Sequence, residues 1–119
     1  MGSQDVIDRE VLDNLLEAVG GDGEFLAELL DTFFADTPQQ FATMHSALLD
    51  GNSEEFRRAA HSLKSNSANF GAVDLSEKAK NLEAMGKTGD LEQAEAPLKD
   101  AEAEYTKVKS ALEMIQKDG

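Results

Sequence analysis

Cysteine and tryptophan are absent from the 119 residues, and there are only two prolines. Without cysteine the chain can form neither a disulfide nor a thiolate nucleophile. Long apolar runs are also missing, because none approaches the roughly 18 residues that a membrane-spanning helix requires, and there is no apolar signal segment. We therefore expect a protein of the cytoplasm that does not associate with a membrane.

Basic residues are scarce as well. Lys and Arg number 11 against 24 Asp and Glu, which gives a net charge of −13. This charge argues against nucleic acid or an anionic membrane surface as a partner. The length predicts one domain with a modest core. We assign residues 8–117 to this domain and residues 1–7 to a disordered tail, whose first three residues resemble an expression remnant.

Alternating strand patterns, glycine-rich phosphate loops and internal repeats are not visible, and apolar residues recur at helical spacing instead. The spacing predicts a helix over residues 8–19 and a second helix over residues 22–36 that is capped by Asp22. Thr37-Pro38 then has the chemistry of a helix start. We expect a new helix, or a kinked continuation of the second one, from this point.

The remaining helices are predicted at residues 38–50, 53–70, 72–86 and 91–116. Ser53 and Glu55 can cap the second of these four helices, and Gly86 is the expected end of the third. Because Pro97 lacks a backbone N–H, we expect a kink or break near Glu95. The fold class that follows is all-α: an antiparallel four-helix bundle, with the additional N-terminal helices packed on its outside or end.

The helix over residues 53–70 carries the most informative pattern. Its apolar side can be buried, whereas one stripe carries a histidine among cations and small side chains: Arg57, His61, Lys64, Ser65 and Ala68. The 18 residues from Phe56 to Val73 contain no acid, although 24 of the 119 residues are acidic. This locally basic face suits a phosphoryl group or a partner with an acidic pocket.

A sequence motif extends from the histidine toward the next helix. It has the form His-x-Leu-Lys-x-x-Ser-x-x-x-Gly-Ala, and its members are His61, Leu63, Lys64, Ser67, Gly71 and Ala72. Together with Leu75 and the Leu82-Glu83 pair, it resembles the signature of histidine-containing phosphotransfer (HPt) domains. Ser65 stands where many members of that family have glycine. Serine is small, so we expect a partner still to dock there.

The resemblance implies a function in a multistep two-component phosphorelay. His61 is then the phosphoacceptor, with Nε2 as the reacting nitrogen, and it exchanges its phosphoryl group reversibly with the aspartate of a response-regulator receiver domain. A sensor or hybrid histidine kinase is the other implied partner. The chain is expected to be a monomeric phosphoryl carrier without a cofactor of its own and not an enzyme, because Mg²⁺ belongs to the receiver.

The residues around His61 indicate which part of this chemistry the chain itself can supply. Lys64, three residues further along the helix, can offset the charge of a phosphoryl group. No carboxylate lies within one helical turn of His61, so we expect a passive nucleophile whose ring no carboxylate orients. A carboxylate of the same chain against the ring would contradict this interpretation. We expect no metal site, because neither His61 nor His45 has a ligand neighbour at helical spacing.

Several residues near the histidine are candidates for partner binding. They are Arg57, Arg58, Ser65, Ala68, Ala72, Lys80 and Glu83, although solvated surface charge is the favoured interpretation of Lys80 and Glu83. Two alternative functions remain open. One is a helical adaptor that never carries phosphate, and the other is the phosphoacceptor domain of a histidine kinase that is labelled from ATP.

Overall fold

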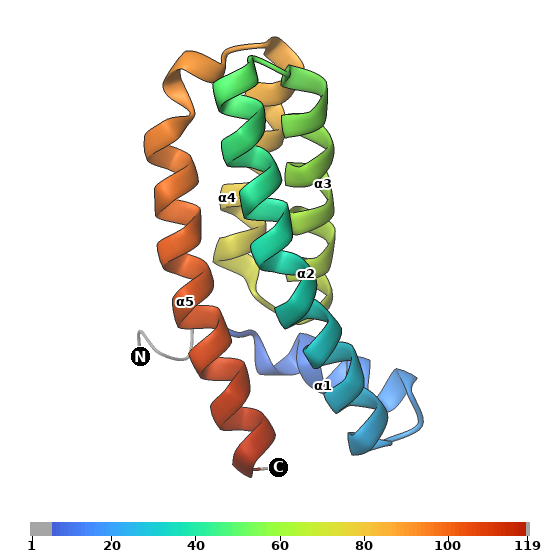
Figure 1. Cartoon of the computed structure of the whole chain (residues 1–119). Coiled ribbons are helices and arrows are strands. Elements are labelled where there is room, and N and C mark those ends of the chain that lie inside the picture. The colour runs from blue at the N-terminus through green and yellow to red at the C-terminus, as the bar shows by residue number, and fades with distance from the viewer. Residues whose placement is uncertain (1–5, 119) are drawn as a thin grey trace.

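The computed structural model describes residues 6–118, and these residues form a bundle of helices (Figure 1). Their order along the chain is α1 (Arg9–Ala18), α2 (Gly23–Asp50), α3 (Ser53–Asn69), α4 (Val73–Thr88), the short 3₁₀ helix η2 (Leu91–Gln93) and α5 (Glu95–Asp118). The four long helices alternate in direction, and α1 crosses one end of the bundle. The predicted all-α four-helix bundle is confirmed. No helix in the described part of the chain is long and apolar enough to span a membrane.

The first long helix, α2, passes through Pro38 without a break. Asp22 caps it as predicted, because its carboxylate accepts hydrogen bonds from the N–H groups of Glu24 and Phe25. The Thr37 hydroxyl does not cap a new helix but donates to the Phe33 carbonyl at 2.7 Å. Of the two predicted arrangements at Thr37-Pro38, the structure therefore has the continuation, and the 22–36 segment is the first half of a bundle helix.

The N-cap of α3 lies one residue earlier than the sequence predicted. The Asn52 side chain accepts a hydrogen bond from the Glu55 N–H at 3.1 Å, so Asn52 is the N-cap and neither Ser53 nor Glu55 takes that role. Asn and Ser are about equally good N-cap residues, so the sequence alone does not distinguish Asn52 from Ser53.

Gly86 lies inside α4 and is not its end, contrary to the prediction. The helix continues to Thr88, and Gly89 closes it with a left-handed φ of 77°. A Cβ atom at Gly86 would lie 2.8 Å from the Cα atom of Arg57. The glycine therefore allows the backbones of α3 and α4 to approach each other closely, a role that the sequence pattern did not reveal.

The break before α5 is confirmed. Ala94, which is not helical, separates η2 from α5, and α5 begins at Glu95. Pro97 consequently falls in the first turn of α5, where a backbone N–H has no partner within the helix, so its missing N–H costs nothing there.

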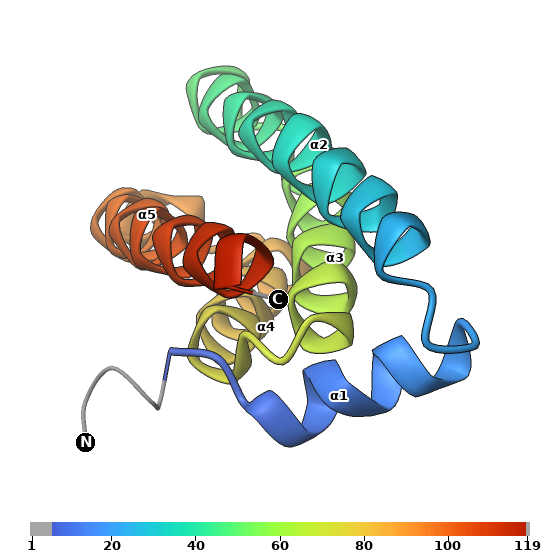
Figure 2. The same cartoon turned by 90° about the horizontal axis from the view of Figure 1, so that it is seen from below.

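The buried core runs along the bundle and continues under α1. In Figure 2, which looks along the bundle from its α1 end, the long helices surround the core in the cyclic order α2, α3, α4 and α5. At this end the Asp8 N–H donates to the Gly71 carbonyl at 2.7 Å, and Ile7 is buried. Ile7 therefore belongs to the core and not to the predicted tail, while residues 1–5 of that tail lie outside the described residues.

Candidate functional site

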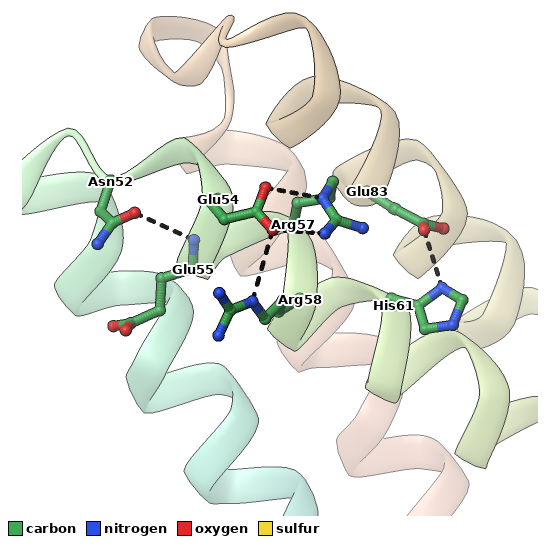
Figure 3. Close-up of polar contacts among 7 residues, drawn as sticks. All are labelled: Asn52, Glu54, Glu55, Arg57, Arg58, His61 and Glu83. Atoms are coloured by element: carbon green, nitrogen blue, oxygen red, sulfur yellow. Dashed lines mark hydrogen bonds and ion pairs between the residues drawn. The ribbon is translucent and has the colours of Figure 1, made fainter.

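His61 lies near the middle of α3, on the side that faces α4. Its side chain is 55% exposed, as the stripe of small and charged residues predicts. The ring is not isolated, however, because Nδ1 lies 2.8 Å from Oε2 of Glu83 on α4 (Figure 3). The other ring nitrogen, Nε2, points away from Glu83.

Glu83 is a buried carboxylate with two partners from α3. Its side chain is 7% exposed, and its second oxygen, Oε1, lies 2.7 Å from Nζ of Lys64. The hydrogen bond from Lys64, together with the contact to His61, holds the pKa of Glu83 below its usual range despite the opposing effect of burial. The carboxylate is therefore ionised at neutral pH.

An ionised carboxylate can only accept hydrogen bonds, so the Nδ1 atom of His61 must carry the proton of this contact. In the neutral ring the Nε2 atom then holds a free lone pair. Because Nε2 is the nitrogen that points away from Glu83, the site presents an accessible nucleophile with a fixed ring orientation.

The packing of α3 against α4 brings the pair together. The two helices run antiparallel, and their backbones approach each other closely at Arg57 and Gly86. His61 follows Arg57 by one turn of α3, and Glu83 precedes Gly86 by one turn of α4, so His61 and Glu83 lie opposite each other. Nearer the start of α4, the Ser76 hydroxyl donates to the Lys64 carbonyl at 3.0 Å and supports the same register.

The prediction that no carboxylate orients the His61 ring is wrong. It rested on residues within one turn of α3, whereas Glu83 comes from the neighbouring helix, 22 residues away. The related expectation, that such a carboxylate would contradict a phosphocarrier, is wrong as well. Glu83 occupies Nδ1 and leaves Nε2 free, so the contact orients the nucleophile instead of blocking it.

The cations near His61 are paired with acids that come from outside the acid-free run. Nη2 of Arg57 lies 2.6 Å from Oε2 of Glu54, and Nε of Arg58 lies 3.5 Å from the same oxygen (Figure 3). The hydrogen bond from Arg57 lowers the pKa of Glu54. An acid-free stretch of sequence is therefore not an acid-free surface, and the predicted excess of positive charge is largely compensated.

The other predicted docking residues divide into two groups. Ser65, Ala68 and Lys80 are exposed, as a docking role requires. Ala72 lies in the turn between α3 and α4 and is fully buried, so the prediction that it contacts a partner is wrong. Glu83 is neither a solvated charge nor a free docking group, because it is buried and bound to α3.

A hollow of about 410 Å³ lies between α2 and α3 and was not predicted. Arg58 and Ser62 line it from α3, and Gln40 lines it from α2. The side-chain oxygen of Gln40 is buried and has no hydrogen-bond partner among the residues that the structure describes. The helical pattern could not reveal this feature, since it depends on how α2 and α3 face each other.

The second histidine, His45, forms a similar pair between α2 and α5. Here it is Nε2 that contacts the carboxylate, 2.9 Å from Oε1 of Glu102, and both side chains are 40% exposed. His45 thus forms a contact between helices. Among residues 6–118, no group of three or more potential ligands is placed to hold a metal ion.

A surface histidine with one free nitrogen, on a rigid bundle of antiparallel helices, defines a class of phosphoryl carriers. Comparison with known proteins agrees: the family model of the Hpt domain matches residues 28–117. A crystal structure of histidine-containing phosphotransfer protein B (HptB) from Pseudomonas aeruginosa PAO1 is similar to the chain, with 32% sequence identity, a TM-score of 0.87 and 96% of each chain covered. No curated protein sequence matches.

The chain therefore belongs to the Hpt domain family, and its function is histidine phosphotransfer in a phosphorelay. The resemblance deduced from the motif is confirmed at the level of family, fold and function. Proteins of this family are carriers that work with receiver domains and kinases.

Proposed function

We propose that His61 is the phosphoacceptor and that Nε2 is the reacting atom. The observation that carries this proposal is the contact between Nδ1 and the buried Glu83 carboxylate, which fixes the ring while more than half of the side chain stays exposed. His45 provides the contrast, because there Nε2 is the nitrogen engaged by a carboxylate.

The transfer step follows from this geometry. The lone pair of Nε2 attacks the phosphorus of an aspartyl phosphate, an N–P bond forms, and the P–O bond to the aspartate breaks so that its carboxylate leaves. The ring keeps its proton on Nδ1 and becomes positively charged. The negative charge of Glu83, 2.8 Å away, stabilises that cation, and the reverse step returns the phosphoryl group to an aspartate.

Lys64 has two roles in this proposal. First, its ammonium group lies 2.7 Å from Glu83 and keeps that carboxylate ionised. Second, Lys64 is 31% exposed and lies one turn from His61, so its ammonium group can offset charge on a phosphoryl group. The second role requires the ammonium to move away from Glu83 or to be shared between the two anions, and the four methylene groups of lysine permit either movement.

The proposed partner is the receiver domain of a response regulator, which brings the aspartate and the Mg²⁺ that its chemistry requires. A sensor or hybrid histidine kinase is the proposed source of the phosphate. The exposed side chains of Ser65 and Ala68 leave room over α3 beside His61, and Arg58 extends this surface to the hollow against α2. We propose that the receiver docks on this surface.

Substitution of the histidine tests the proposal directly. His61→Gln should abolish labelling by a phosphorylated receiver, because the amide has no nucleophilic lone pair, while the helical circular dichroism signal stays unchanged. His45→Gln is the matched control and should be labelled as the unsubstituted chain is. Labelling of the His61→Gln variant would show that another residue accepts the phosphate.

The same assay separates the remaining alternatives. Incubation with a phosphorylated receiver, and separately with ATP plus a histidine kinase, is followed by a test for phosphate that is acid-labile and base-stable. Labelling by the receiver supports the phosphorelay carrier. Labelling by the kinase alone would indicate a kinase phosphoacceptor domain, and no labelling in either reaction would indicate an adaptor.

A further inference from the structure

An apolar groove lies at the end of the bundle that α1 crosses, away from His61. Its volume is about 350 Å³. The first turns of α2, the last turns of α5 and one side of α1 form its walls, and its apolar lining is Leu12, Leu16, Leu26, Ala27, Leu30 and Ile115. Two leucine pairs at i and i+4 therefore face each other across α1 and α2, the arrangement of a groove that receives a helix.

The groove is open and its surroundings are apolar. Leu12 and Leu30 belong to the core, whereas Leu16 and Leu26 are only partly buried. On the helices that form the walls, Phe25 is 45% exposed and Met114 is 66% exposed. Exposed apolar surface of this kind on a soluble domain indicates an interaction site.

The charge around the groove is strongly negative. Residues 8–36, which form α1 and the first half of α2, contain nine acids and one cation, Arg9. That cation lies 3.8 Å from Asp13 on the same helix. Asp13 itself lines the groove together with Arg9, and Glu17, Glu24 and Glu28 are exposed on the same two helices. A partner that fills this groove must therefore be apolar on one side and positively charged around it.

Different helices form the groove and carry His61. The groove is lined by α1, α2 and α5, whereas His61 and Glu83 come from α3 and α4. Among the long helices, α2 and α5 are the pair opposite α3 and α4 (Figure 2). A partner in the groove would therefore leave the phosphotransfer surface uncovered, and both partners could bind at once.

We propose that this groove docks a basic amphipathic helix of a partner protein. A second copy of the chain is disfavoured, because its net charge of −13 and its own acidic rim would repel those of the first. The site thus holds a carrier on a larger assembly while His61 exchanges phosphate.

A designed peptide tests this proposal. The probe is a fluorescent peptide of about 15 residues, the length at which an isolated helix becomes marginally stable, with leucines at i, i+3, i+4 and i+7 and lysines elsewhere on its exposed face. Its binding to the full chain is measured by fluorescence anisotropy. A matched peptide has glutamate in place of every lysine. We expect the lysine peptide to bind, the glutamate peptide to bind much more weakly, and added salt to weaken the lysine peptide.

Variants of the chain locate the binding site. Ala27→Leu fills the groove with a good helix former and should weaken the lysine peptide about tenfold, the effect of one lost leucine-sized anchor. Ala35→Leu, at an exposed position of the same helix, should leave binding unchanged. Labelling of His61 by a phosphorylated receiver should be the same in both variants and in the presence of peptide, so failure of this proposal is distinguishable from failure of the phosphoacceptor assignment.

Three outcomes would overturn the proposal. The first is a lysine peptide that does not bind, or that binds the unsubstituted chain and the Ala27→Leu variant equally, which indicates diffuse attraction to an acidic protein. The second is equal binding of both peptides, which indicates a groove that selects apolar shape alone. The third is concentration-dependent dimerisation that Ala27→Leu removes, because the occupant is then a second copy.

Discussion

The carboxylate of Glu83 contacts two side chains of α3 at once, the His61 ring at 2.8 Å and the Lys64 ammonium group at 2.7 Å. A buried carboxylate is costly unless it is paired, and here two donors from one helix pair it. The same contacts determine the tautomer of the ring. At the residue scale, the site is therefore a histidine whose ring orientation and tautomer are determined by a neighbouring helix.

Removing the charge of Glu83 should slow transfer without removing the phosphoacceptor. In Glu83→Gln the amide oxygen can still accept the Nδ1 proton, but the negative charge that stabilises the phosphorylated ring is lost. We expect the rate of transfer from a phosphorylated receiver to fall about tenfold, as expected for the loss of one charge-assisted hydrogen bond. Rapid-quench labelling measures this rate. Glu102→Gln, which removes the carboxylate of the His45 pair, is the control, and equal rates in both variants would exclude a role for the Glu83 charge.

Lys64 supports the site from the other side of Glu83. In Lys64→Ala the carboxylate keeps one partner and the phosphoryl group loses a nearby cation, so transfer should slow by about tenfold while the domain stays folded. Lys99→Ala, an exposed lysine of α5, is the matched control and should transfer at the normal rate. An unchanged rate in Lys64→Ala would remove this lysine from the mechanism.

At the scale of elements, the pairing of α3 with α4 is what turns separate residues into a site. Gly86 brings the two backbones together beside Arg57, and the next turn then places Glu83 against His61. The register of these helices therefore determines the chemistry.

Gly86→Ala tests this dependence. The added Cβ would lie 2.8 Å from Arg57 Cα, so α3 and α4 must separate, and we expect a loss of about 1–3 kcal/mol in the free energy of unfolding together with slower transfer to His61. Urea denaturation measures the first effect and receiver labelling the second. Gly23→Ala is the control, since a Cβ there meets nothing within 4 Å. If both variants are equally stable, the close approach at Gly86 does not matter.

The helices could be predicted from the sequence because their signals are local. Apolar spacing, the Asp22 cap and the position of Pro97 all act within a few residues, and each indicated the correct element. The ends were less accurate where equivalent residues compete, as Asn52 and Ser53 do for one cap. Gly86 was misread because a glycine that ends a helix and one that permits close packing look the same in sequence.

The exposed position of His61 could be predicted from the sequence, but its environment could not. An exposed histidine follows from the pattern of one helix, whereas the contacts of Glu83 and the pairing of Arg58 with Glu54 depend on tertiary or side-chain geometry. Ala72 is a docking candidate in sequence because it is a small residue near the histidine, and the sequence does not reveal that it is buried at the end of the bundle where Ile7 and α1 pack.

At the scale of the whole molecule, the acidic body carries two distinct surfaces. The face formed by α3 and α4 holds His61 with paired cations around it, and the end that α1 crosses holds an apolar groove on acidic helices. A carrier of this design can exchange phosphate at one surface while the other remains available for attachment.

The most direct test of the phosphoacceptor assignment is nuclear magnetic resonance of the chain labelled with ¹⁵N in its histidines and phosphorylated by a receiver domain. Coupling between phosphorus and a ring nitrogen identifies both the residue and the atom that carries the phosphate. We predict a single phosphorylated nitrogen, Nε2 of His61, with Nδ1 still protonated against Glu83. Phosphate on Nδ1 of His61, or on His45, would contradict the arrangement that Glu83 imposes.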